Sequence, residues 1–194
     1  EQQVQNAVRA VSDADSQLAE EVIVEEQLVD EMEVDIDEAC ILIIARRQPA
    51  ASDLRLVMMV TKAINDLERI GDEAKKIANH AILLAEEGGL SKGYPEIRHI
   101  GASVSKMLAN ALDAFARFDA DAAMRTIEED KQIDLDYKTA LRELVTYMME
   151  DPRSISRVIN VLWVVRSLER IGDHTKNLCE QIIYVVKGKD IRHK

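Results

Sequence analysis

The chain is poor in the residues that interrupt helices and in those that favour β-strands. Its 194 residues include only 7 glycines and 3 prolines, and aromatic residues make up 4%. Hydrophobic residues account for 47% and charged residues for 31%, so the chain can bury a core and keep a charged surface. Such a composition with so few breakers is typical of an all-α protein, and we recognise no strand pattern.

Several functional classes lack their sequence signals. No apolar run approaches the roughly 18 residues of a membrane-spanning helix, and no signal peptide is recognisable. There is no glycine-rich phosphate loop, no G-x-S-x-G, no HExxH and no Cys/His nucleophile pair. The net charge of −11 argues against a nucleic-acid surface, which needs basic residues facing phosphates. These absences favour a non-enzymatic protein whose partners are cations or basic protein surfaces.

The chain contains only two cysteines, Cys40 and Cys179, and each lies in an apolar helical context. There is no CxxC and no Cys/His cluster, so we expect small core residues in a reducing cytoplasm. The chain begins at Glu1 and not at a methionine, which favours a start inside a longer protein.

The hexapeptide LERIGD occurs twice, as Leu67–Asp72 and as Leu168–Asp173, 101 positions apart. An identity of this length indicates that the chain is built from two copies of one unit. Earlier segments align at an offset of 104, which matches Asp15 with Asp119, Glu26 with Asp130 and Asp30 with Asp134.

Apolar periodicity predicts three helices in each copy. The expected ranges are 1–11, 15–47, 54–86, 97–118, 119–149 and 152–186, with the short linkers typical of antiparallel bundles. Ser52 and Asp53 are candidate caps of the third helix. We place a domain boundary at the Gly/Pro cluster 88–95, which gives three-helix bundles at 1–88 and 94–194.

The apolar stripe of the helix at 15–47 predicts that Leu28, Met32 and Ile36 face the core. The single tryptophan, Trp163, lies within VLWVV and is expected in the core as well.

Acidic residues recur four positions apart in both copies. Each LERIGD carries such a pair, and so does the helix before it. The four pairs are Glu26 with Asp30, Glu68 with Asp72, Asp130 with Asp134, and Glu169 with Asp173. Residues four apart share a helix face, with Cβ atoms about 5–6 Å apart. In an antiparallel hairpin the two pairs of one copy can meet, so we predict one cluster of four carboxylates per copy.

Four like charges in a partly desolvated groove would cost several kcal/mol without a cation. Carboxylate oxygens are ligands of hard divalent cations, so all eight residues are candidate metal ligands for Mg, Mn, Zn or Fe, as one ion or as a small cluster.

Simpler interpretations remain open at this point. Acidic pairs are common on solvated helix faces, and Arg69 and Arg170 are available to neutralise them. Gly71 and Gly172 either allow close helix packing or let an ion approach. His174 has no counterpart in the first copy and is expected at the surface. A carboxylate-bridged metalloenzyme on a helical bundle and a purely structural module are the alternatives to a regulatory protein.

The chain resembles the PhoU family of bacterial phosphate-signalling proteins. The resemblance covers nearly the whole chain and is carried by residues 46–78, 115–137 and 147–180, which include both LERIGD copies. It implies two tandem three-helix bundles, each with a metal-binding E(D)xxxD pair at the eight residues above. It also implies that residues 1–11 are the end of a longer first helix.

For function, the resemblance implies a cytoplasmic and commonly dimeric regulator of phosphate uptake that represses the phosphate regulon. Such proteins contact a membrane sensor kinase (PhoR) and the ATPase of the phosphate transporter (PstB). These expectations come from the resemblance alone.

Overall fold

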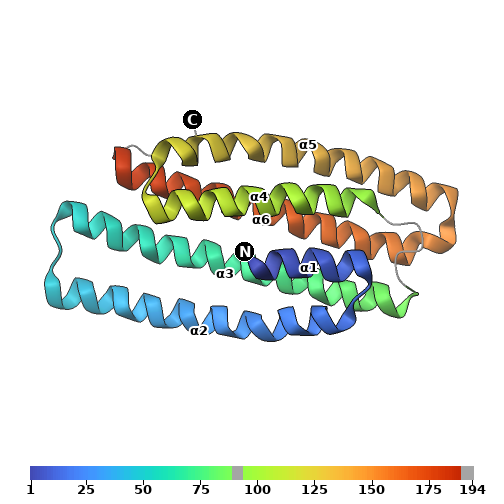
Figure 1. Cartoon of the computed structure of the whole chain (residues 1–194), viewed down its shortest axis with the longest axis horizontal. Coiled ribbons are helices and arrows are strands. Elements are labelled where there is room, and N and C mark those ends of the chain that lie inside the picture. Colours follow the sequence, from blue (N-terminus) through green and yellow to red (C-terminus); the bar gives the residue numbers. More distant parts are fainter. Residues whose placement is uncertain (89–93, 189–194) are drawn as a thin grey trace.

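A computed structural model of the chain describes residues 1–88 and 94–188. Over these residues the protein consists of six α-helices and one short 3-10 helix, without strands, so the all-α expectation is confirmed. The elements are α1 (Gln2–Asp13), α2 (Ser16–Arg47), α3 (Ala51–Glu86), α4 (Pro95–Arg117), α5 (Ala120–Glu150), η1 (Pro152–Ser154) and α6 (Ile155–Lys187). They form two three-helix bundles side by side, with α2 and α5 on opposite outer sides (Figure 1). None of the described helices is both long and apolar enough to cross a membrane.

The turns between the first two helices of each half are built alike. Ala14 and Phe118 adopt left-handed conformations with φ of 54° and 53°. The backbone N–H groups of Asp15 and Asp119 then reach back to the preceding helix, each in a 2.9 Å hydrogen bond. Both aspartates cap the next helix, because the Asp15 carboxylate accepts from Leu18 N–H and the Asp119 carboxylate from two N–H groups.

The third helix begins earlier than the sequence pattern predicts. Its first residue is Ala51, and no side chain caps it, so the prediction that Ser52 or Asp53 caps a helix starting at 54 is wrong. Asp53 lies in the first turn instead, where a carboxylate interacts favourably with the helix dipole.

The two halves share their hydrophobic core. The larger group of buried apolar residues draws from all six helices, and a smaller one joins Ala63 of α3 to Leu178 of α6. α3 and α6 lie against each other along the middle of the molecule (Figure 1). The division into domains at 1–88 and 94–194 therefore stays a prediction, and part of its linker and its last six residues lie outside the described residues.

The main difference between the halves is the length of the first helix. α1 has 12 residues and α4 has 23, and the repeat offset aligns α1 with the second part of α4. The first turns of α4 have no counterpart in the first half. Ile36 is therefore 37% exposed, whereas its counterpart Ala140, which lies near Pro95 and Ile100 of α4, is buried. Leu28 and Met32 are more than half exposed as well, so the prediction that these three residues face the core is wrong.

The prediction that Trp163 lies in the core is also wrong. It is 51% exposed, whereas Val161, Val164 and Val165 on the same helix are fully buried. The buried residues follow the helical period, which puts position 163 on the outer face of α6.

Close packing of α1 on α4 leads to a first prediction. A Cβ atom at Gly101 would lie 2.6 Å from Val8 Cγ1, whereas one at Gly71 would meet nothing closer than 3.5 Å. Gly101→Ala should therefore destabilise the fold by about 1–2 kcal/mol, since overpacking outweighs the gain in helix propensity. Gly71→Ala is the control and should stabilise it by up to about 1 kcal/mol. Urea denaturation of both variants measures their free energies of unfolding. A Gly101→Ala protein as stable as the Gly71→Ala control would contradict the prediction.

Candidate metal-binding carboxylate clusters

The acidic pairs of each half lie on its second and third helices, which pack against each other. We call Glu26, Asp30, Glu68 and Asp72 the first cluster, and Asp130, Asp134, Glu169 and Asp173 the second cluster. The first cluster lies between α2 and α3, and the second lies between α5 and α6. In each cluster one carboxylate of the middle helix is buried, Glu26 with 1% exposure and Asp130 with 3%.

Electrostatics show that the carboxylates of the first cluster act on one another. Desolvation raises the pKa of Glu68 most, and the charge of Asp72 raises it further. Arg69 opposes the shift, and Asp30 on the facing helix adds to it. Asp30 on α2 therefore lies close enough to Glu68 on α3 to act on its charge.

The second cluster behaves in the same way. Desolvation raises the pKa of Glu169, followed by the charge of Asp173, and Asp134 and Asp130 add smaller contributions against the opposing Arg166. The pKa of Asp173 is raised by desolvation and then by Asp130 and Asp134. Burial and neighbouring carboxylates thus oppose the ionisation of Glu68, Glu169 and Asp173, and an added cation would relieve this repulsion.

The structure also shows a lysine in each cluster that the sequence prediction missed. Lys75 donates a hydrogen bond from Nζ to Oε2 of the buried Glu26, and Lys176 donates one to Asp130 Oδ2 at 3.0 Å. Both lysines stand three residues after the last residue of LERIGD, so they are equivalent in the repeat. The hydrogen bond to the carboxylate is the largest cause of the raised pKa of each lysine.

The arginines of the two LERIGD copies do not play equivalent roles. Arg69 pairs with Glu68 at 3.3 Å, as expected. Arg170 instead forms an ion pair at 3.0 Å with the buried Glu73 of the other half. Lys76 pairs with the same carboxylate oxygen. In the second cluster Arg166 takes the place of the expected arginine, at 3.0 Å from Glu169.

The helix-interior glycines stand beside the buried carboxylates. A Cβ atom at Gly172 would lie 3.4 Å from Asp130 Oδ1, and one at Gly71 would lie 3.8 Å from Glu26 Cγ. Both distances are ordinary van der Waals contacts, so the helices pack closely here, but the contacts do not require a glycine at either position.

His174 does not join the second cluster. Its Nδ1 lies 3.1 Å from Asp66 Oδ1 on α3, and Asn177 donates to the same oxygen at 3.2 Å. The side chain is 18% exposed, so this contact between the halves covers much of it and the surface expectation is wrong.

The donors of both clusters suit a hard divalent cation, because all of them are carboxylate oxygens. In the part of the chain that the structure describes, however, no three Asp, Glu, His or Cys side chains lie close enough together to hold an ion. The Asp30 and Asp173 side chains are exposed, whereas Glu26 and Asp130 each form an ion pair with a lysine. Metal binding therefore requires side-chain rearrangement, and the metal ligation of the eight residues stays a prediction.

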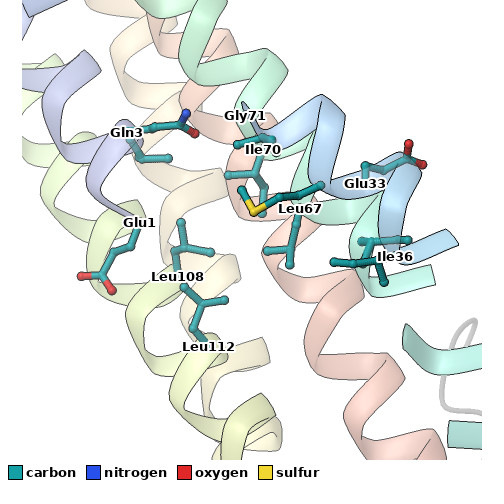
Figure 2. A pocket seen from close by; sticks show the side chains of 13 residues that line it. Glu1, Gln3, Glu33, Ile36, Leu67, Ile70, Gly71, Leu108 and Leu112 are labelled. Carbon is teal, nitrogen blue, oxygen red and sulfur yellow. The ribbon is translucent and has the colours of Figure 1, made fainter. Parts of the chain in front are cut away.

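A mostly apolar pocket of about 240 Å³ lies beside the first cluster. Leu67, Ile70 and Gly71 of α3 form one side, with Ile36 of α2 and the Leu108 and Leu112 side chains of α4 around them (Figure 2). Its only acidic lining residues are Glu1 and Glu33, so it lacks the converging donors of an active site.

Comparison with known proteins gives consistent matches over the whole chain. A family model described as "PhoU domain" matches residues 1–81 and 97–182. A phosphate-specific transport system accessory protein PhoU homolog from Pseudomonas aeruginosa is 60% identical over 193 residues, covering 100% of this chain and 80% of the relative. The corresponding protein of Escherichia coli is 49% identical over 196 residues, with the same coverage.

Solved structures agree with these matches. The crystal structure of PhoU from Pseudomonas aeruginosa superposes with a TM-score of 0.95 at 60% identity, covering 97% of this chain and 90% of the other. That of the phosphate transport system regulatory protein PhoU from Streptococcus pneumoniae gives 0.89 at 29% identity, covering 98% and 89%.

Fold and site together define a class, that of duplicated three-helix-bundle proteins with one carboxylate cluster in each half. Similarity over the full chain then settles the family within this class. The chain belongs to the PhoU family.

The raised pKa of Glu169 predicts a pH-dependent effect on stability. A carboxyl group whose pKa is raised in the folded state disfavours folding while ionised, and the penalty disappears as pH falls through the raised pKa towards the ordinary 4.5. Glu169→Gln should therefore raise the melting temperature at pH 7 in EDTA, and the advantage should shrink near pH 5.

Calorimetry at both pH values measures this effect. Glu128→Gln is the control, because Glu128 is 65% exposed and pairs only with Lys131, so it should change little. A Glu169→Gln protein that is less stable than the parent at pH 7 would show that the cluster is not repulsive.

Proposed function

We propose that this protein is a non-enzymatic regulator of phosphate uptake and a negative regulator of phosphate-regulon signalling. The main support is similarity over the whole chain to relatives named as accessory proteins of the phosphate-specific transport system.

The proposed mechanism is electrostatic. Each cluster opposes four carboxylates with one lysine and one arginine, and so keeps about two uncompensated negative charges. One divalent cation per cluster would bring this charge close to zero. A partner surface with basic residues would then meet a different potential in the loaded and the metal-free protein, which changes affinity and association rate.

The proposed partners are the sensor kinase PhoR and the transporter ATPase PstB, which this protein would connect as a cytoplasmic adaptor, acting as a homodimer. Both partners follow from the family resemblance. The excess of negative charge, −11 for the chain, supports basic docking surfaces on them.

Metal binding is tested by neutralising one carboxylate in each cluster. The variant Asp72→Asn with Asp173→Asn should lose most bound metal in elemental analysis after dialysis against Mn²⁺. It should also lose the rise in melting temperature that Mn²⁺ gives the parent, because a ligand of the native state stabilises it.

The matched control is Glu31→Gln with Asp35→Asn. These two acids have the same spacing on α2 but are exposed and lie outside both clusters. The control should bind metal as the parent does. Equal metal content in all three proteins would reject the metal assignment.

The adaptor role is tested by co-purification from cell extract at low salt, with and without chelator. We expect the transporter ATPase and the kinase to be retained with metal, and their yield to change when chelator is added. Retention of neither in both conditions would contradict the proposal. Turnover of a phosphate ester or of peroxide by the metal-loaded protein would instead identify the metalloenzyme alternative.

A further inference from the structure

The strongest feature left unexplained is the pair of lysines inside the clusters. Lys75 and Lys176 occupy equivalent positions of the two halves and bind equivalent buried carboxylates, Glu26 and Asp130. The surrounding pairs are not equivalent, because Arg170 binds outside its cluster whereas Arg69 binds within its own. Retention of the lysine contact in both halves indicates that the ammonium group has a specific task there.

A buried ionised carboxylate needs a counter-charge. Here the ammonium group of lysine lies against one oxygen of each buried acid. A divalent cation bound to the same carboxylate would lie beside the ammonium charge, so repulsion between the two cations makes them compete for the buried acid. Displacement of the lysine is possible, because the two lysine side chains are about one third exposed and can turn into solvent.

The lysines also affect the other carboxylates of their clusters. Lys75 interacts electrostatically with Asp30 and Asp72 as well as with Glu26, and Lys176 interacts with Asp173 as well as with Asp130. A bound cation at either cluster would therefore meet a positive charge as well as an occupied oxygen.

We propose that Lys75 and Lys176 are built-in counter-ions that compete with a divalent cation for Glu26 and Asp130, and that they thereby set the metal affinity of the two clusters. This inference rests on the metal binding in the proposed function. In the metal-free protein the lysine keeps the buried acid compensated. In the loaded protein the ion takes its place, and the ammonium group moves to the surface beside the cluster.

The test measures the affinity for Mn²⁺ by isothermal titration calorimetry. The metal-free protein is titrated with Mn²⁺ at one pH and one ionic strength. The double variant Lys75→Met with Lys176→Met keeps the aliphatic stems and removes both charges. It should bind Mn²⁺ at least about tenfold more tightly than the parent, because the ion no longer displaces a competitor.

Lys76→Met is the matched control. Lys76 follows Lys75 on α3 and binds Glu73, an acid that is as buried as Asp130 but lies outside both clusters and keeps Arg170 as a second partner. The control should bind Mn²⁺ within about twofold of the parent, because a more distant exposed charge is screened by salt. An increase equal to that of the double variant would show a general charge effect and overturn the proposal.

A second substitution works in the opposite direction and covers the case in which the methionine variant folds poorly. Lys75→Arg with Lys176→Arg keeps the charge and offers a planar fork that binds a carboxylate through two hydrogen bonds. This variant should bind Mn²⁺ more weakly than the parent. Binding as tight as that of the parent would contradict competition.

Thermal stability gives a readout that is independent of the affinity measurement. In EDTA the methionine variant should melt roughly 5 °C or more below the parent, because its buried acids have lost their partner. Saturating Mn²⁺ should recover most of this difference. A loss of stability that Mn²⁺ does not recover would mean that the lysines only support the fold.

The outcomes separate this inference from the proposed function. If the parent and the methionine variant bind Mn²⁺ equally well, metal binding stands and the counter-ion role fails. If neither binds at millimolar Mn²⁺, the metal assignment fails, and the counter-ion role fails with it. If only the variant binds, the lysines exclude metal from the parent, which supports the counter-ion role in its strongest form.

Discussion

The structure is organised around one carboxylate per half that is buried between two long helices. Glu26 and Asp130 lie on the middle helices and face Gly71 and Gly172 of the LERIGD segments, where any other residue would bring a side chain closer. A buried charge needs a compensating group, and the lysine three residues further along supplies it. The LERIGD segment with its following lysine can therefore be understood as one unit. Its lysine compensates the buried acid, and its two carboxylates add negative charge at the edge of the cluster.

The two halves keep this unit and differ in what surrounds it. The first helix covers its bundle fully in the second half and only in part in the first, so apolar residues of α2 such as Met32 remain exposed there. Arg170 connects the halves through Glu73, and His174 does so through Asp66, whereas Arg69 serves its own cluster. The same arginine position of the repeat thus serves the cluster in one copy and the α3–α6 interface in the other. The shared core and these polar contacts explain why the two bundles form one body.

The sequence predicts much of this fold, whereas the role of the eight acidic residues as metal ligands stays a prediction. Helical periodicity and the caps at Asp15 and Asp119 place the elements, and the repeat offsets identify the acidic pairs on equivalent helices. Periodicity identifies residues that share a face of a helix, but not whether another helix covers that face. For this reason the predicted burial of Ile36 and Trp163 is wrong. The lysines carry a readable signal, since both stand at the same repeat position. The repeat does not show which basic residue pairs with a given acid, because Arg69 and Arg170 are equally repeated and pair differently.

An internal counter-ion changes what metal binding can do in such a protein. If four carboxylates met without compensation, an ion would bind tightly and stay bound, and occupancy would carry little information. With the lysine present, each buried acid is compensated in both states, so the fold does not depend on the ion. The metal-free cluster still keeps about two uncompensated negative charges at its exposed edge. In the proposed mechanism, occupancy would change the surface potential and the position of an ammonium group while the helices stay in place. This separation of fold stability from surface charge is what an electrostatic adaptor requires, because a partner protein senses the surface potential and not the buried carboxylate.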